Sequence, residues 1–254
     1  MNDILEIAAA NQQRAREVIR DTDLEAIWRS VGAEANLVGS LRTGLLMKHR
    51  DIDFHIYSSP LRVADSFAAM ARLAENPRIR RIEYGNLLDA QDQCLEWHAW
   101  YADADERLWQ IDMIHMPRGS AWDGYFERVA DRISAVLTDE TRRAVLQIKY
   151  DTPDEVKIMG IEYYQAVLRD GVRTYAEFEA WRAAHSGMDA VSPPETPLPC
   201  AALPAGVWES IEPQMRQGDT AAAASKKTDR SFRGTVRFAS MPAQPPPLHD
   251  RLAP

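Results

Sequence analysis

Apolar residues in the first third of the chain recur at helical spacing. Between residues 3 and 31 they fall three or four positions apart, with an interruption near Asp21–Asp23, where a capping residue can begin a second helix. The same spacing returns after Pro60 and runs to about Glu75. The pattern therefore predicts two helices before the first long strand and one helix after it.

Alternation of apolar and polar residues predicts that strand and three more. Within 51–57, isoleucine and phenylalanine occupy the even positions and share one face of the expected strand. Further extended segments are expected at 79–84, 94–101 and 108–116. This order of elements predicts an α+β fold in which helices cover a mixed sheet.

The second half of the chain changes character twice. From about Trp122 to His185 the apolar spacing is helical, and Gly171 and Gly187 are expected to end helices. Beyond Met188 lie eleven of the fifteen prolines, with little periodicity, which is typical of a disordered segment. The expected organisation is a sheet domain with its amino-terminal helices at 1–118, a helical lobe at 119–187 and a disordered tail rich in proline and alanine at 188–254.

Composition and charge narrow the classes of function. The chain has 254 residues, of which 45% are hydrophobic, enough for a substantial core. The formal net charge is −8, and the tail from Met188 is neutral, so the excess of acid belongs to the expected folded body. An acidic body disfavours broad binding to nucleic acid. The sequence therefore favours a small-molecule or protein partner.

Nothing in the sequence predicts export or a membrane span. The amino terminus lacks the basic start and continuous apolar core of a signal peptide, and no run approaches about 18 apolar residues. The two cysteines, Cys94 and Cys200, are far apart and fit a reducing compartment. We expect a cytoplasmic protein without a membrane partner.

The candidate chemistry lies around two aspartates. Asp51 and Asp53 are two positions apart on the expected strand, so both carboxylates point to the same face. Two adjacent carboxylates repel each other, and a divalent cation between them relieves the repulsion. Upstream, Gly39 and Ser40 follow a short apolar run, where glycine lets backbone N–H groups approach a phosphate. Asp112 lies in a later apolar strand, where an unpaired carboxylate is costly to bury.

This ordered set resembles the signature of the DNA polymerase beta-like nucleotidyltransferase superfamily, as carried by bacterial nucleotidyltransferase-domain proteins. The resemblance spans roughly residues 34–116: a Gly-Ser turn, an Asp-x-Asp strand about a dozen residues later, and a lone aspartate in the strand RLWQIDMIHM. It implies a nucleotidyltransferase sheet domain followed by a helical lobe.

The resemblance also implies a reaction and roles for residues. It implies transfer of a nucleoside monophosphate from a nucleoside triphosphate to a hydroxyl, with release of pyrophosphate and use of Mg²⁺ or Mn²⁺. Asp51, Asp53 and Asp112 would be the catalytic metal ligands, with Asp112 also the base for the acceptor hydroxyl. The residues expected at the nucleotide are Gly39, Ser40, Arg42 and Lys149. The acceptor, whether small molecule, protein or RNA end, and the choice among ATP, GTP, CTP and UTP are left open.

Several other side chains have an ordinary structural interpretation beside the functional one. Glu96 and His98 face the acceptor if their strand neighbours that of Asp112, and otherwise His98 is a hydrogen-bonded surface residue. His55 shares the face of the aspartate pair and is expected at the rim of the site. Lys149 lies in the helical half, where the resemblance places a basic residue against the triphosphate, although a solvated lysine is the more common outcome for such a residue. The loop between the Gly-Ser turn and the aspartate pair carries bulky residues at 45–47, unlike common members of the superfamily. These residues argue against the usual closure of this loop over the nucleotide.

Two alternative functions follow from the same residues. The first is a non-catalytic nucleotide-binding or toxin–antitoxin-type interaction module on this fold, which the presence of all three aspartates disfavours. The second is a metal-dependent phosphohydrolase, although no His-x-x-x-His or similar ligand spacing is present.

Overall fold

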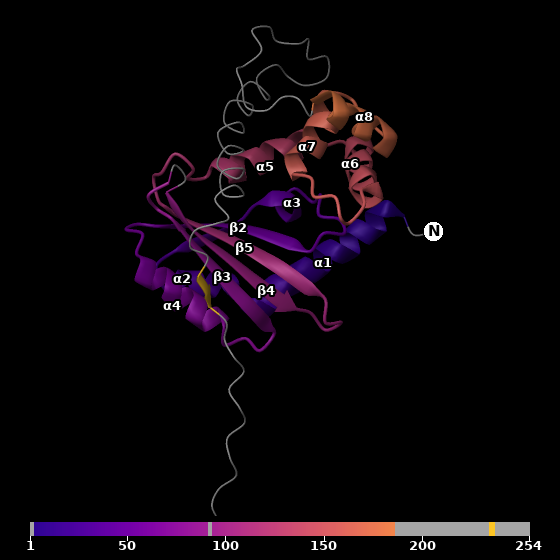
Figure 1. The fold of residues 1–254 in the computed structure, drawn as a ribbon. Helices are drawn as coiled ribbons and strands as arrows, with labels where there is room; N and C mark the ends of the chain where they lie inside the picture. Colours follow the sequence, from indigo (N-terminus) through magenta and orange to yellow (C-terminus); the bar gives the residue numbers. More distant parts are fainter. Residues whose placement is uncertain (1–2, 91–92, 186–233, 237–254) are drawn as a thin grey trace, which may run out of the picture.

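The computed structural model describes residues 3–90, 93–185 and 234–236, and its centre is one mixed sheet (Figure 1). The strand order is β1-β2-β5-β4-β3-β6. β2 and β5 run parallel, whereas every other neighbouring pair is antiparallel. The strands are β1 Glu34–Leu37, β2 Asp51–Ser58, β3 Ile79–Leu87, β4 Cys94–Ala102, β5 Leu108–Pro117 and β6 Gly234–Val236. The α+β fold predicted from the sequence is confirmed.

Helices lie in two groups around this sheet. The first group is α1 Ile4–Thr22, α2 Leu24–Arg29, α3 Gly39–Arg42 and α4 Val63–Leu73; the second is α5 Tyr125–Val136, α6 Asp139–Asp151, α7 Gly160–Tyr164, the π-helix η1 Gln165–Arg169 and α8 Tyr175–His185. Figure 1 shows the second group gathered at one end of the sheet. Within the described residues, no helix has both the length and the apolar character needed to cross a membrane.

Helix boundaries follow the sequence signals with two differences. The break between α1 and α2 is at Asp23, whose φ of 48° is left-handed, and its side chain makes no capping hydrogen bond. Asp3 does cap α1, because its carboxylate accepts a hydrogen bond from Leu5 N. The helix expected to open at Pro60 begins later, at Val63.

One face of the sheet is covered by α1, α2 and α4 and forms the first core. Ile52, Phe54 and Ile56 of β2 are fully buried there, as the alternation predicted. Trp28 of α2 and Trp97 of β4 lie in the same cluster. Because side chains alternate along a strand and the apolar ones of β2 face this core, the aspartates of β2 lie on the opposite face.

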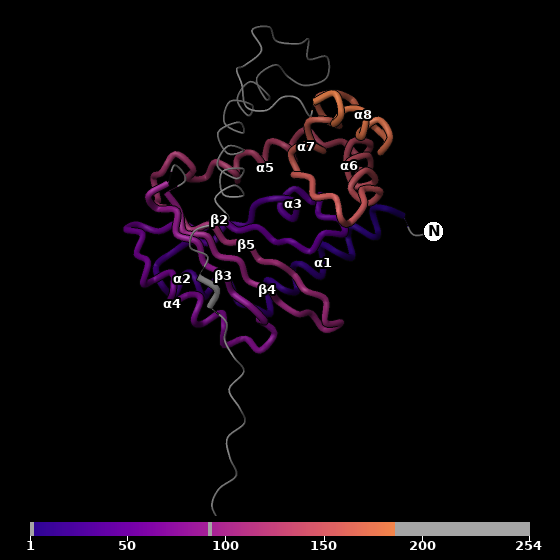
Figure 2. Tube along the Cα trace, viewed as in Figure 1, coloured from indigo at the N-terminus to yellow at the C-terminus, as the bar shows by residue number. Residues whose placement is uncertain are grey.

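A second core joins the helical lobe to the start of the chain. Ile4 and Ala8 of α1 pack with residues of α5 to α8, while Ala15 and Val18 of the same helix pack under the sheet. Figure 2 shows α1 running from beside the lobe to behind the strands. The helix therefore belongs to both cores and fixes the lobe against the sheet.

The bulky loop before β2 is also an anchor. Leu45 and Met47 are buried in the lobe core, and Leu46 is buried in the sheet core. Alternating side chains of one short segment thus enter the two cores in turn. This burial accounts for the bulky side chains of residues 45–47, which connect the two cores.

The disordered tail expected at 188–254 lies outside the described residues, except for 234–236. Those three residues form β6, which pairs antiparallel with β3 at the edge of the sheet. Gly171 follows η1 with a φ of 72°, in agreement with its predicted position at a helix end. Gly187 lies outside the described part of the chain.

Two histidines are buried in their neutral form. His115 Nε2 lies 2.7 Å from Ser58 Oγ, and its ring packs against Trp28. His55 packs edge-on against Phe126, with ring centroids 4.6 Å apart. Loss of water disfavours the charged imidazolium, which lowers the pKa of His115 to about 4 and that of His55 to about 3.

Stability should therefore fall on mild acidification. The unfolded histidines take up protons near their ordinary pKa of about 6.5, whereas the folded ones do not, so stability present above that pH is lost as the pH falls. We expect the free energy of unfolding, measured in urea, to drop by about 2 kcal/mol per histidine between about pH 7.5 and pH 5. His55→Phe should remove about half of this drop, and an unchanged slope in that variant would contradict the assignment.

Candidate functional site

Three carboxylates meet on the sheet face opposite the first core. In the parallel pairing of β2 with β5, Asp53 lies beside Asp112 and Asp51 lies beside Gln110. Since residues in register on neighbouring strands project to the same face, Asp51, Asp53 and Asp112 share one surface. Strands distant in sequence thus bring together the three aspartates singled out from the sequence.

The next strands extend this polar surface. On β4, His98 is paired with Asp112 in the antiparallel register, and on β3, Glu83 is paired with His98. His98 Nδ1 lies 2.5 Å from Asp112 Oδ1. The row Glu83, His98, Asp112 and Asp53 therefore crosses four strands, as expected if the β4 strand neighboured that of Asp112.

Crowding of negative charge is strongest at Asp53. Its pKa is raised well above the ordinary value, first because the carboxylate is removed from water and then because Asp51 and Asp112 are close; the ammonium of Lys149 acts in the opposite direction. Asp51 Oδ1 is buried without a hydrogen-bond partner. A buried, unpartnered carboxylate oxygen beside a second acid is a place where a cation is favoured.

Gly39 packs directly against the side chain of Asp53. It has a φ of 66°, and a Cβ at this position would lie 2.0 Å from Asp53 Oδ2. Val38 N, one residue earlier, donates a hydrogen bond to the Asp53 carbonyl oxygen at 2.9 Å. Glycine is thus required both for the left-handed backbone and for the approach to the carboxylate. The turn expected at Gly39 and Ser40 is the start of the short helix α3.

The variant Gly39→Ala should lose more stability than Gly32→Ala. Gly32 has a similar φ of 78°, but a Cβ there meets nothing within 4 Å, so it reports the backbone strain alone. We expect about 1 kcal/mol for Gly32→Ala and about 2 kcal/mol or more for Gly39→Ala in urea unfolding. The double variant Gly39→Ala/Asp53→Ala should be more stable, by at least about 0.5 kcal/mol, than the sum of the two single effects predicts, because Asp53→Ala removes the atoms that clash with the new Cβ. Equal losses for the two alanines would show that the contact with Asp53 does not matter.

The donor set suits a hard divalent cation, although the side chains are not already gathered around one. Among the described residues, no group of three or more His, Cys, Asp or Glu side chains has the geometry of an ion site. Asp112 Oδ1 is turned to His98 and to Gln110 Nε2, 2.8 Å away. The unpartnered Asp51 Oδ1 and the destabilised Asp53 nevertheless supply two oxygen donors of the kind that Mg²⁺ and Mn²⁺ take. The chemistry of these donors fits such a cation, and the assignment of Asp51 and Asp53 as its ligands stays a prediction.

Basic residues near the site have structural partners. Arg42 forms a bidentate pair with Asp131 of α5, with Nε–Oδ1 at 2.9 Å and Nη2–Oδ2 at 3.0 Å. Lys48 pairs with Asp154 and donates to the Thr152 carbonyl. The structure therefore uses Arg42 to hold the lobe against α3, and its role at a nucleotide stays a prediction.

Lys149 is buried, so the interpretation as a solvated lysine is wrong. Its ammonium donates to the Leu45 carbonyl at 3.0 Å and to Tyr164 Oη at 3.3 Å. The nitrogen also lies 5.6 Å from the ring centre of Tyr163. These contacts hold a positive charge between the lobe and Asp53, and binding of phosphate by Lys149 stays a prediction.

Two features of the site were missed or misplaced in the sequence. Gln110 shares the face of Asp112, which its i, i+2 spacing could have indicated. His55 is buried against Phe126 of α5, whereas it was expected at the rim. The sequence carries no local signal for this contact, because the two residues are brought together by the docking of the lobe.

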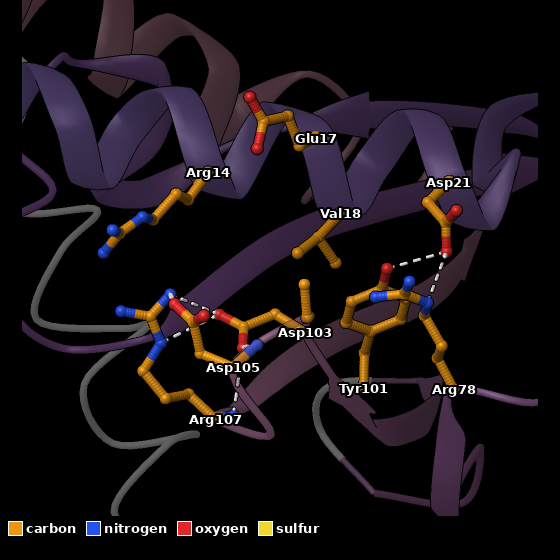
Figure 3. Close-up of a pocket in the computed structure, with 10 residues that line it drawn as sticks. Arg14, Glu17, Val18, Asp21, Arg78, Tyr101, Asp103, Asp105 and Arg107 are labelled. Atoms are coloured by element: carbon orange, nitrogen blue, oxygen red, sulfur yellow. Dashed lines mark hydrogen bonds and ion pairs between the residues drawn. The ribbon is translucent and has the colours of Figure 1, made fainter.

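A separate surface hollow lies on the helix-covered side of the sheet (Figure 3). It is bordered by α1 and by the hairpin between β4 and β5. Several of its polar groups contact one another: Tyr101 Oη donates to Asp21 at 2.7 Å, and Arg107 pairs with Asp103 and Asp105. None of the three aspartates of the candidate site lines this hollow.

Sequence comparison gives no relative for this chain. No protein-family model matches it, and no curated protein matches it.

Comparison of structures finds distant similarity to solved nucleotidyltransferases. A Cid1 poly(U) polymerase bound to MgGTP aligns with a TM-score of 0.46 and 15% identity over 63% of this chain and 50% of the other. The same enzyme with Mg 3′-dATP gives 0.44 and 17% identity over 61% and 49%. A cytoplasmic RNA terminal U-transferase gives 0.43 and 13% identity over 66% and 51%. The chain spans about half the length of these structures, and none of these matches bears on a bacterial origin.

Proposed function

We propose that this protein is a metal-dependent nucleotidyltransferase that moves a nucleoside monophosphate from a nucleoside triphosphate to a hydroxyl group. The observation that carries the proposal is the convergence of Asp51, Asp53 and Asp112 on one sheet face, against a glycine that leaves no room for a side chain. Carboxylates arranged in this way are destabilised without a cation, so their grouping needs a functional reason.

The proposed reaction balances with the residues present. Asp112 accepts the proton of the acceptor hydroxyl, the hydroxyl oxygen forms a bond to the α-phosphorus, and the bond from that phosphorus to the bridging oxygen of pyrophosphate breaks. Pyrophosphate leaves with the electron pair. Gly39 lies beside Asp53 at the start of α3, and Gly39 and Ser40 are proposed to bind the triphosphate.

Asp51 and Asp53 would hold the cation, with Asp112 completing the set. When bound, Mg²⁺ or Mn²⁺ supplies charge neutralisation at the phosphate oxygens. The sheet sets the backbone positions of the three aspartates on two neighbouring strands. Lys149 adds a buried positive charge on the lobe side, which partly opposes the rise in the pKa of Asp53.

The acceptor side favours a small, uncharged or cationic hydroxyl compound. Beyond Asp112 the polar face continues through His98 and Glu83, and Glu96 lies on the same face of β4. Arg81 pairs with Glu83, and its guanidinium carbon lies 4.2 Å from the ring centre of Trp100. A polyanionic acceptor would meet carboxylates here, whereas an amine would be attracted. An RNA end and a protein side chain are the alternatives in the test.

Thermal unfolding with each nucleoside triphosphate, with and without Mg²⁺, tests the binding step. At a concentration one hundred times Kd, a ligand that binds only the folded state adds about 2.7 kcal/mol. This corresponds to a rise of several degrees in melting temperature. We expect the rise to require Mg²⁺ and to vanish in Asp53→Ala.

Products of the triphosphate labelled at the α-phosphorus then separate the candidate functions. Label on an added amine-containing or neutral hydroxyl compound, with pyrophosphate released, supports the proposal; label on RNA ends or on protein changes the acceptor. Inorganic phosphate as the product would indicate a phosphohydrolase. Magnesium-dependent binding without turnover of any acceptor would indicate a nucleotide-binding module.

A further inference from the structure

Two side chains hold the same oxygen of Asp112. His98 Nδ1 lies 2.5 Å from Oδ1, and Gln110 Nε2 donates to Oδ1 at 2.8 Å. Among the described residues, every hydrogen bond that the structure gives to this carboxylate falls on Oδ1. The two oxygens of Asp112 are therefore in different surroundings.

The sheet sets both contacts. His98 is the direct cross-strand neighbour of Asp112 on β4, and Gln110 stands two residues earlier on the same strand and face. One donor thus approaches from the next strand and the other along β5. Because both backbones belong to central strands of the sheet, the register keeps both side chains on the face of Asp112.

Hydrogen bonds to one oxygen of an aspartate carboxylate fix the orientation of the whole group. Without these donors, Asp112 would lie beside Asp53 and would be free to turn about its terminal torsion, which is broad for aspartate. With Oδ1 occupied by two donors, the lone pairs of Oδ2 are the ones left to accept a proton. A base must present such a lone pair within hydrogen-bond reach of the proton that it removes.

We propose that His98 and Gln110 are positioning residues, which fix Asp112 so that Oδ2 accepts the proton of the acceptor hydroxyl. This inference rests on the nucleotidyltransferase function proposed above. It differs from a purely structural role, in which a cross-strand pair stabilises the sheet and changes the reaction rate only as far as it changes folding and binding.

Variants that keep volume but remove the donor test the inference. His98→Phe retains a ring, and Gln110→Met retains the length of the side chain. His98→Asn places an amide N–H near the former position of Nδ1. Tyr101→Phe is the matched control, since Tyr101 is also on β4 and also donates to a carboxylate, Asp21, but on the opposite face of the sheet.

The measurements are single-turnover transfer and equilibrium binding of Mg²⁺ with the nucleoside triphosphate. Loss of a partner that orients a reacting ligand costs about 10-fold to 100-fold. We expect this loss in the transfer rate of His98→Phe and Gln110→Met, with Kd changed less than about threefold, and recovery to within about threefold of wild type in His98→Asn. Tyr101→Phe should transfer at the wild-type rate.

The outcomes distinguish this inference from the proposed function. Wild-type transfer by both donor-deleted variants overturns the positioning role and leaves the proposed function intact. Equal loss of binding, stability and rate, without recovery in His98→Asn, indicates a structural role and also overturns it. If the wild-type protein transfers to no acceptor, crystal structures decide: Asp112 should turn in His98→Phe and keep its orientation in His98→Asn, and an unchanged carboxylate in both variants would reject the inference.

Discussion

Asp112→Asn should bind the magnesium complex of a nucleoside triphosphate yet transfer almost nothing. The substitution keeps the shape of the side chain beside Asp53 but removes its charge and its ability to accept a proton. We expect Kd to rise no more than about tenfold, or about 1.4 kcal/mol. Transfer should fall by about a hundredfold or more, the scale for losing a general base, with a lost metal ligand adding to it. Equilibrium titration and single-turnover transfer on the same preparation measure the two effects separately.

A carboxylate on the opposite face serves as the control. Asp21 accepts a hydrogen bond from Tyr101 at the surface hollow, away from the candidate site, and Asp21→Asn should transfer normally. Wild-type transfer by Asp112→Asn would remove Asp112 from the reaction. Transfer would then depend on Asp51 and Asp53 and on a base other than Asp112.

Removing both other aspartates should abolish metal-dependent binding without unfolding the protein. Asp51→Ala/Asp53→Ala removes the two proposed cation ligands, so we expect the affinity for the magnesium–triphosphate complex to fall more than about a hundredfold, or about 2.7 kcal/mol. The apo melting temperature should equal or exceed that of the wild type, because the pKa of Asp53 is raised and its ionised form is disfavoured in the folded state.

The pH dependence of this effect has a definite sign. A carboxyl whose folded pKa is raised destabilises the fold as the pH rises above its unfolded pKa of about 3.9, so the advantage of the double variant should be present at pH 7 and should shrink as the pH falls toward 4. Asp103→Ala gives the contrast. Hydrogen bonds from Trp109 and Arg107 outweigh the loss of water and lower the pKa of Asp103 to about 2, so this variant should be destabilised at pH 7. An apo double variant that unfolds would show that Asp51 and Asp53 are structural.

The strands were predictable because their side chains alternate. Burial of the even positions of β2 follows from the period of two, and it leaves both aspartates on the other face. The start of α4 was placed too early, because Pro60 is tolerated at a helix start but does not require one. The π-helical turn at Gln165–Arg169 has no pattern in the sequence that distinguishes it from an ordinary helix.

The candidate site was predictable only in part, because some of its contacts are local in the sequence and others depend on the topology of the sheet. The spacing of Asp51 and Asp53 is local, and it places both side chains on one face. Which strand lies beside β2 is a matter of topology, and no local pattern states that Asp53 is paired with Asp112. The surroundings of Lys149 and Arg42 depend on how the lobe docks, so the sequence alone could not distinguish solvated bases from bases held by Leu45 and Asp131.

The parallel pairing of β2 with β5 has a consequence for the order of folding. β3, β4 and β5 are joined as antiparallel neighbours along the chain, whereas Asp53 meets Asp112 only after a loop of about sixty residues has closed. Such long-range pairing is slow to form, so we infer that the three carboxylates come together late. Their repulsion would then arise after the folding transition state, when the topology is already formed. It would therefore raise the unfolding rate more than it slows folding.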